Sequence, residues 1–310
     1  MELLWALESI RSPFLDGVFG VITRLGEEMI LILVFCALYW CVNKKMGYVM
    51  GVAFFLSSLV VQGMKIIFRI DRPWVVDPAF EPVGGAIRQA TGYAFPSGHT
   101  QNAAALLGSL AAMLKPAPVK VACVLLAVLV AFSRMYLGVH FLSDVLVSLA
   151  VTFLLVWFAV KVVADDSFCK KRELILSLVI ALCAIAVIVI AAALYHSGAT
   201  EPRQLSDATR AAGAAIAFAI GMFVERVYIR FSVKTKNIFL QVVKFALGLA
   251  GTIAIQEGVR FIGTGLVIDA IRYFLMVAWI TICYPLIIRR FFSVADKGGA
   301  AEGAVSNRNG

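Results

Sequence analysis

Charged residues are scarce in this chain of 310 residues. Asp, Glu, Lys and Arg together make up 15% of the sequence, whereas hydrophobic residues make up 61%. Because soluble domains carry about 25% charged residues, this scarcity excludes an ordinary soluble globular protein. The apolar runs approach the roughly 20 residues that a helix needs to cross a bilayer, and they lack the alternation typical of barrel strands. We therefore predict an all-α, polytopic membrane protein.

Metal-binding cysteine patterns are absent from the sequence. Its six cysteines include no CxxC pair, and most of them lie within apolar runs. Such cysteines are usually packing residues, so the sequence indicates neither a metal site nor a disulfide framework. The net charge of +9 comes mostly from basic residues in short loops, without a basic patch interleaved with aromatic residues. This distribution argues against a nucleic-acid partner.

The N-terminal segment lacks a small-residue cleavage site after an apolar stretch. Glu2, Glu8 and Pro13 interrupt its hydrophobic residues, which is atypical of a secretory signal. We expect residues 1–25 to form an amphipathic helix at the membrane interface, broken at Pro13. At the other end, residues 293–310 are rich in Gly and Ala and are expected to form a disordered cytoplasmic tail.

Apolar segments of near-helical length recur along the rest of the chain. Lys and Arg residues gather in alternate loops between these segments, and such loops are typically cytoplasmic. The loops that contain residues 71–99 and 134–140 then lie on the outer side. The expected spans are 29–42, 48–67, 101–114, 119–132, 141–164, 174–195, 208–223, 238–255 and 270–288.

Three groups of unusual residues fall at helix mouths on this outer side. Three cations with few acids to neutralise them favour an anion with several oxygens, and phosphate is the obvious one. The start of the third span adds unpaired backbone N–H groups and the positive end of a helix dipole. The bundle can bring the groups together around a phosphate. They are Lys65 and Arg72 near the end of the second span, Ser97, Gly98 and His99 at the start of the third, and Arg134, His140 and Asp144 between the fourth and fifth.

Two histidines and one carboxylate could carry out phosphoryl transfer at such a site. His140 and Asp144 are spaced i and i+4, so on one helix the carboxylate would accept a hydrogen bond from one ring nitrogen. The other ring nitrogen would remain free as a nucleophile, and His99 would protonate the leaving oxygen and later activate water. Spacing alone does not decide which histidine has which role. Carboxylates for a Mg²⁺ site are sparse here, so we expect no metal and no other cofactor.

The combined pattern resembles the three-part signature of the type 2 phosphatidic acid phosphatase (PAP2) superfamily. The resemblance implies that His140 forms a phosphohistidine intermediate, that Asp144 supports His140, and that His99 acts as acid and base. It also implies that the phosphate is held by Lys65, Arg72, Ser97, Gly98 and Arg134. The signature reads Lys65-x6-Arg72-Pro73, Pro96-Ser97-Gly98-His99 and Ser133-Arg134-x5-His140-x3-Asp144, with every position filled.

The resemblance also carries an expectation for the domain organisation. The superfamily core has six helices arranged around a site at the membrane surface. We expect this catalytic core at residues 26–195 and about three additional transmembrane helices at residues 196–292. The larger number of spans resembles the glucose-6-phosphatase and sphingosine phosphate phosphatase branches.

These features favour a membrane phosphatase that acts on a lipid phosphate or diphosphate at the outer face of a bacterial cell membrane. The expected substrate types are undecaprenyl diphosphate, phosphatidic acid and phosphatidylglycerol phosphate. A soluble or sphingoid phosphomonoester is the enzymatic alternative. The non-enzymatic alternative is a lipid or phosphate transporter that retains a phosphate site. Transporters usually place ionisable residues near the bilayer midplane, and the centres of these spans have almost none.

Overall fold

The chain folds into a bundle of long helices, and the all-α, polytopic prediction is confirmed. This computed structural model describes residues 1–90, 92–163 and 169–292, so the predicted tail at 293–310 lies outside the described residues. Within the described part, seven helical segments are long and apolar enough to cross a membrane, and a bent pair of helices adds a possible eighth.

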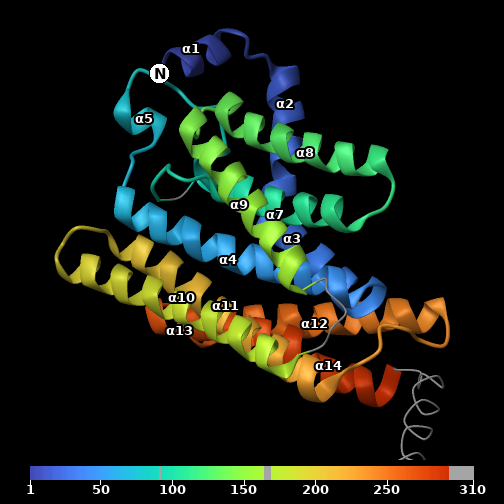
Figure 1. Cartoon of the computed structure of the whole chain (residues 1–310). Helices are drawn as coiled ribbons and strands as arrows, with labels where there is room; N and C mark the ends of the chain where they lie inside the picture. The colour runs from blue at the N-terminus through green and yellow to red at the C-terminus, as the bar shows by residue number, and fades with distance from the viewer. Residues whose placement is uncertain (91, 164–168, 293–310) are drawn as a thin grey trace, which may run out of the picture.

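The helices lie close to the spans expected from hydropathy (Figure 1). Short π-helical or 3₁₀ turns follow α2, α3, α11, α13 and α14. The bounds are α1 Glu2–Ser9, α2 Pro13–Ile22, α3 Glu28–Cys36, α4 Lys44–Phe68, α5 Pro73–Val76, α6 Ala86–Gln89, α7 Gly98–Met113, α8 Ala117–Tyr136, α9 Leu142–Val163, α10 Lys170–His196, α11 Pro202–Val224, α12 Ile238–Ile262, α13 Leu266–Ala278 and α14 Tyr284–Ile287.

The N-terminal segment consists of two helices, with the break at Pro13 that the sequence predicts. The chain breaks before Pro13, which occupies the first turn of α2, where its missing N–H costs nothing. The side chain of Ser12 caps this helix by accepting a hydrogen bond from the backbone N–H of Leu15. Segments Pro13–Gly26 and Glu28–Val42 meet at a bend of 49° and together are apolar enough for one broken span. The interfacial position of residues 1–25 stays a prediction.

The largest difference in bounds concerns α12, which we expected to end at residue 255 and which continues to Ile262. Charged residues ended the hydropathy-based prediction at this point. Glu257 and Arg260 are nevertheless compatible with a helix, and their side chains approach within 3.8 Å as an i, i+3 pair. A helix can therefore extend past the end of its apolar run.

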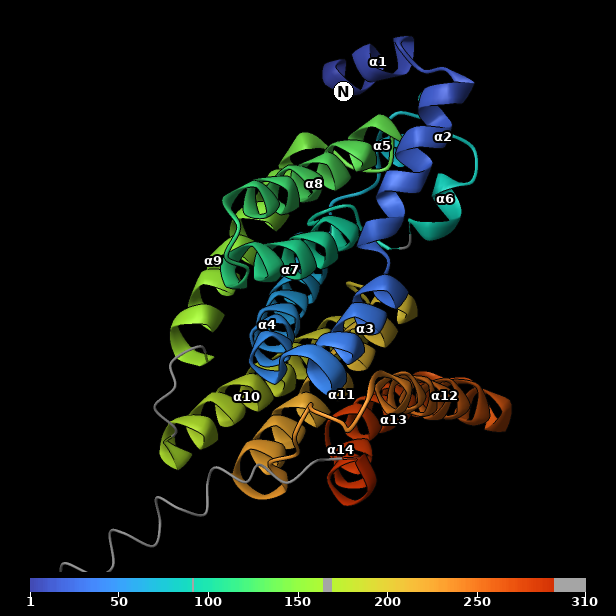
Figure 2. The same cartoon turned by 90° about the vertical axis from the view of Figure 1, so that its right-hand side faces the viewer.

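Helix α4 is the central element of the bundle. It packs against α7 and α9 on one side and against α10 and α11 on the other, and it crosses the middle of the molecule in Figure 1. In both views α1 lies at one end of the molecule and α12 to α14 lie at the other (Figure 2). The later helices α11 and α13 thus meet the rest of the bundle through α4 and its neighbours.

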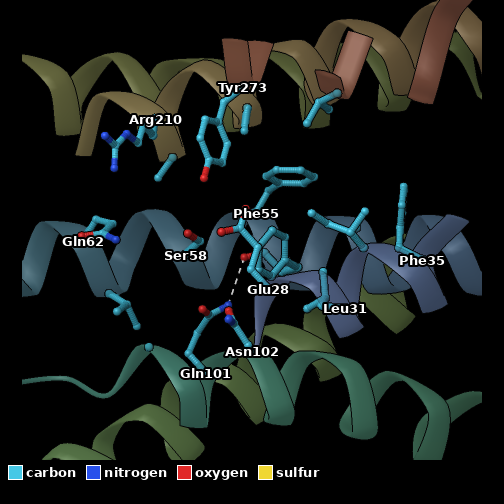
Figure 3. Close-up of a pocket in the computed structure, with 18 of the residues that line it drawn as sticks. Glu28, Leu31, Phe35, Phe55, Ser58, Gln62, Gln101, Asn102, Arg210 and Tyr273 are labelled. Carbon is cyan, nitrogen blue, oxygen red and sulfur yellow. Dashed lines mark hydrogen bonds between the residues drawn. The ribbon is translucent and has the colours of Figure 1, made fainter. Parts of the chain in front are cut away.

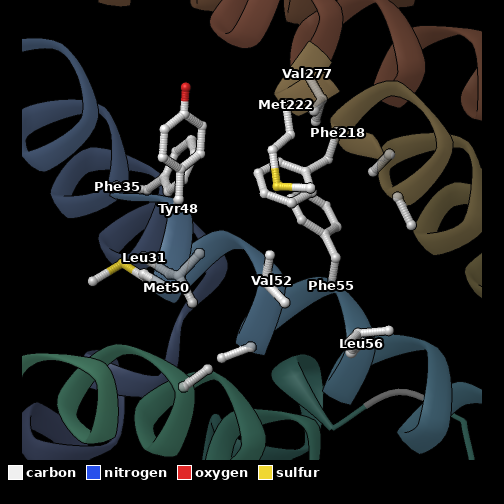
Figure 4. Close-up of a cluster of buried hydrophobic side chains, with 14 of the residues drawn as sticks. Leu31, Phe35, Tyr48, Met50, Val52, Phe55, Leu56, Phe218, Met222 and Val277 are labelled. Carbon is white, nitrogen blue, oxygen red and sulfur yellow. The ribbon is translucent and has the colours of Figure 1, made fainter. Parts of the chain in front are cut away.

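The contact between α4 and α11 is close and aromatic (Figure 4). The rings of Phe55 and Phe218 stack with their centroids 4.6 Å apart, and both side chains are buried. Gly51 permits this approach, because a Cβ atom there would come within 2.4 Å of the Phe218 ring. Helix α11 is therefore part of the same hydrophobic core as α4.

Candidate active site

The three sequence groups meet at one cavity of about 140 Å³. It lies where α4 ends, where α7 begins and where the loop between α8 and α9 turns. Six of the eight predicted site residues line this cavity. They are Lys65, Arg72, Gly98, His99, Arg134 and His140.

The other two predicted residues, Ser97 and Asp144, are completely buried and do not line the cavity. The Ser97 hydroxyl caps α7, because its oxygen accepts hydrogen bonds from the Thr100 backbone N–H at 3.4 Å and from the Thr100 hydroxyl at 3.0 Å. The backbone N–H of Ser97 donates to the carbonyl oxygen of Asp144 at 3.2 Å. These contacts hold the start of α7 against the start of α9.

His140 and Asp144 form the predicted pair, but His140 precedes α9 instead of lying on it. The Nδ1 atom of His140 lies 3.2 Å from Oδ2 of Asp144. The same oxygen accepts the backbone N–H of Phe141 at 2.8 Å, and the Ser143 hydroxyl donates to Oδ1 at 3.3 Å. The chain reaches this geometry through Gly138, whose positive φ of 78° favours glycine.

The second nitrogen of His140 faces a cation. Nη1 of Arg72 lies 2.8 Å from Nε2 of His140. An arginine can only donate, so this contact assigns a lone pair to Nε2 and the proton to Nδ1, where Asp144 accepts it. The imidazole thus presents an unprotonated Nε2 at the cavity.

Burial and surrounding cations maintain this neutral state. Burial lowers the pKa of His140 well below its usual range, and the positive charges of Arg72, Arg134 and Lys65 lower it further. The side chain is only 2% exposed. Since protonation is disfavoured, Nε2 of His140 stays unprotonated near neutral pH and accepts the hydrogen bond from Arg72.

Two of the cations are tied to backbone carbonyls around the cavity. Lys65 Nζ donates to the carbonyl oxygen of Tyr93 at 2.7 Å. Arg72 donates through Nε to Gly92 at 2.9 Å and through Nη1 to Val139 at 2.9 Å. These bonds fix the segment before α7 and the loop before α9 against the end of α4.

The third cation, Arg134, has N–H groups that no described residue accepts. Arg134 is 1% exposed and donates from Nη1 to the Thr23 hydroxyl at 2.8 Å. Its buried Nε and Nη2 atoms, and Nε2 of His99, have no hydrogen-bond partner among the described residues. Buried polar atoms normally have partners, so these atoms mark places where oxygens of a bound anion would be stabilised.

Five further residues line the cavity, and sequence reasoning missed three of them that lie on α4 and α11. Gln62 lies one turn before Lys65 on α4, and this i, i+3 spacing could have indicated it. Gln204 and Asp207 lie on α11, far along the chain from the three motifs. No local pattern connects them to the site, because only the packing of α11 against α4 brings them there.

His, Cys, Asp and Glu side chains are the usual protein ligands of metal ions, and the chain has a third histidine besides His99 and His140. No cluster of three or more His, Cys, Asp or Glu side chains suited to a metal ion occurs within residues 1–90, 92–163 and 169–292. The third histidine, His196, is exposed at the end of α10 and does not line the cavity.

Comparisons with known proteins match both halves of the chain. The sequence model described as the PAP2 superfamily matches residues 46–168, which contain all three motifs. A second model, described as the transmembrane extension of PAP2 superfamily phosphatases, matches residues 209–297. Phosphatidylglycerophosphatase B of Bacillus subtilis (strain 168) is 33% identical over 164 residues, which cover 49% of this chain and 76% of that protein.

Two solved structures are also similar to part of the chain. The crystal structure of Aquifex aeolicus LpxE is 25% identical, with a TM-score of 0.47, and the match covers 52% of this chain and 93% of that one. The crystal structure of the first transmembrane PAP2 type phosphatidylglycerolphosphate phosphatase from Bacillus subtilis is 30% identical, with a TM-score of 0.43. That match covers 51% of this chain and 81% of that one.

Proposed function

The chain belongs to the PAP2 superfamily and is a multi-pass membrane lipid phosphatase, and we propose that it cleaves its substrate through a phosphohistidine at His140. One observation carries this proposal. His140 presents an unprotonated Nε2 to a cavity that Lys65, Arg72 and Arg134 also line, while Asp144 holds its Nδ1 at 3.2 Å. A nucleophile, an orienting carboxylate and positive charge are thus combined at one place.

The first step transfers the phosphoryl group to the enzyme. Nε2 of His140 attacks phosphorus, a P–N bond forms, and the bond from phosphorus to the lipid oxygen breaks. Burial and the positive charges of Arg134, Arg72 and Lys65 lower the pKa of His99 to about 3, and the negative charge of the bound phosphate offsets these cations so that His99 takes up a second proton. The protonated His99 donates this proton to the leaving oxygen, so the lipid leaves as an alcohol or, from a diphosphate, as a monophosphate. Asp144 stabilises the positive charge that develops on the ring, and the three cations stabilise the negative charge on the transferring group.

The second step regenerates the enzyme. A water molecule gives a proton to His99 and attacks phosphorus, and the P–N bond breaks to release inorganic phosphate. Every group in this scheme is a side chain of the protein, and no metal or organic cofactor takes part.

Among lipid phosphates, we propose phosphatidylglycerol phosphate as the first substrate to test. The similarity to phosphatidylglycerophosphatase B supports this choice over phosphatidic acid and undecaprenyl diphosphate. Lipid substrates suit a site at the end of membrane helices, because the phosphate can reach the cavity while the hydrocarbon stays in the bilayer.

Purified protein in detergent should release inorganic phosphate from at least one of these three lipids, and EDTA should leave the rate unchanged. The comparison set includes glucose 6-phosphate and sphingosine 1-phosphate as soluble and sphingoid phosphomonoesters. Faster turnover of either one would favour the alternative substrate class. Failure to release phosphate from any compound would contradict the proposed function and favour a transporter with a phosphate site.

We propose that the site opens to the outer side of the membrane. Basic residues at the opposite end of the bundle support this orientation, since Lys44, Lys45, Arg226 and Arg230 line a separate cavity there. In a cysteine-free background, Glu81→Cys, exposed between α5 and α6 in the predicted outer loop, should react with a membrane-impermeant maleimide on intact cells. Lys236→Cys, exposed between α11 and α12, should react only after the cells are opened. The reverse pattern would place the site inside.

A further inference from the structure

A second cavity of about 300 Å³ adjoins the phosphate cavity (Figure 3). Helices α3, α4, α7, α11 and α13 all contribute to its walls. Gln62, Gly98 and Asp207 line both cavities, so the two spaces meet at these residues. Helices α11 and α13 belong to the part of the chain that follows the catalytic core.

The lining changes from polar to apolar with distance from the phosphate cavity. On α4, Gln62 and Ser58 are followed by Phe55 toward the other end of the helix, and on α11 Asp207 and Arg210 are followed by Ala214. Helices α3 and α13 repeat this order: Glu28 precedes Leu31 and Phe35 on α3, and Tyr273 precedes Met276 on α13 and Ile280 in the π-helical turn that follows it. In Figure 3, Gln62 and Arg210 lie at one side of the view and Phe35 at the other.

The depth of this cavity matches one leaflet of a bilayer. Its lining on α4 extends from Gln62 to Gly51, which corresponds to about 16 Å at the helical rise per residue. The hydrocarbon core of a bilayer is roughly 30 Å thick, so about half of it is one leaflet. A chain anchored by a phosphate at the membrane surface would occupy this depth.

Ion pairs brace the wall formed by α11 and α13. Arg210 contacts Asp269 on α13 and lies 3.3 Å from Asp207 on its own helix. Arg272 lies 3.0 Å from Asp269. These pairs lie next to the polar end of the cavity and hold the two helices in register, so the wall beside Asp207 is firmly placed.

We propose that this second cavity, the chain cavity, binds one hydrocarbon chain of the lipid whose phosphate is attacked by His140, and that α11 and α13 supply one of its walls. The proposal rests on the proposed phosphatase function. It assigns the C-terminal helices a direct part in substrate recognition. A hydrocarbon chain that moves from the bilayer into the cavity gains little free energy of burial, because both surroundings are apolar. The cavity therefore acts mainly by aligning the phosphate with His140.

The test uses the purified full-length protein in nanodiscs of neutral phosphatidylcholine. The substrates are alkyl phosphates from butyl to hexadecyl, with p-nitrophenyl phosphate as a reference that has no chain. Ala214→Phe fills the chain cavity from α11, and Val277→Phe fills it from α13. In each variant the ratio of kcat/KM for dodecyl phosphate to that for p-nitrophenyl phosphate should fall by about tenfold relative to wild type. Each substrate partitions into the nanodisc to the same extent whichever protein the disc holds. Partitioning therefore cancels when the ratio of a variant is compared with that of wild type.

Two further variants make the test decisive. Ala254→Phe adds the same ring to an exposed position on α12 that does not line the cavity, and it should leave the ratio unchanged. Met276→Ala enlarges the cavity and should move the preferred alkyl chain to a greater length. An unchanged ratio in both filling variants, or an unchanged length preference in Met276→Ala, would overturn the chain cavity while leaving the phosphatase function intact. A wild type that hydrolyses none of these substrates would overturn both.

Discussion

The His140→Ala variant should lose activity by about 10⁴-fold or more, whatever the substrate. Without the imidazole no P–N bond can form, and the cations alone can only bind and polarise the phosphate. The fold should survive the change, because Asp144 keeps its hydrogen bonds from the Phe141 N–H and the Ser143 hydroxyl. Phosphate release by the detergent-purified protein measures the loss, and a thermal melt checks that the variant is folded.

The chain provides a matched control for this experiment. His196 is the remaining histidine beside His99 and His140, and it is exposed away from the cavity. His196→Ala should retain full activity. Wild-type protein quenched during turnover should also carry an acid-labile phosphoryl group that His140→Ala lacks. A His140→Ala protein that keeps more than a small fraction of wild-type turnover would disprove the nucleophile assignment.

The second large effect should come from His99→Asn, which replaces the imidazole by an amide of similar shape and so removes a group able to transfer a proton. Turnover of a lipid phosphate should fall by about 10²- to 10⁴-fold, the usual contribution of general acid catalysis. His99 lines the phosphate cavity, and its buried Nε2 has no partner among the described residues. The proposed role as acid follows from this position.

The choice of leaving group separates the two jobs proposed for His99. p-Nitrophenolate leaves without a proton, so the first step with p-nitrophenyl phosphate should remain fast in His99→Asn. Hydrolysis of the phosphoryl-enzyme should remain slow, because water is no longer activated. A rapid burst of about one p-nitrophenol per enzyme followed by slow turnover is therefore expected. Equal losses with lipid and aryl substrates and no burst would argue against an acid role.

Much of the site could be predicted because its parts are local. Lys65 and Arg72 are separated by a fixed number of residues at the end of one helix, and Ser97 to His99 begin another. Alternation of basic loops predicts that these helix ends lie on the same side of the membrane. In the structure, six of the eight expected residues line one cavity, which agrees with that reasoning.

Other features could not be predicted because they depend on packing between distant segments. The hydroxyl of Ser97 was expected to bind phosphate, and in this structure it caps α7 by accepting from Thr100. Arg134 reaches Thr23, more than a hundred positions earlier in the chain, at 2.8 Å. Gln204 joins the cavity only because α11 packs on α4. Hydropathy and spacing carry no information about such contacts.

The sequence by itself determined that this protein is a helical membrane phosphatase. Its long apolar runs require a bilayer environment, and the types and spacing of its motif residues indicate phosphoryl transfer. Only the tertiary structure decided how α11 and α13 relate to that chemistry. Their residues carry no catalytic pattern, and their sequence is that of ordinary apolar helices. The close contact of Phe218 with Phe55 places Asp207 beside the phosphate cavity and Ala214 in the adjoining one. Such a contact depends on side-chain shapes from both helices at once, which a pattern along one helix does not contain.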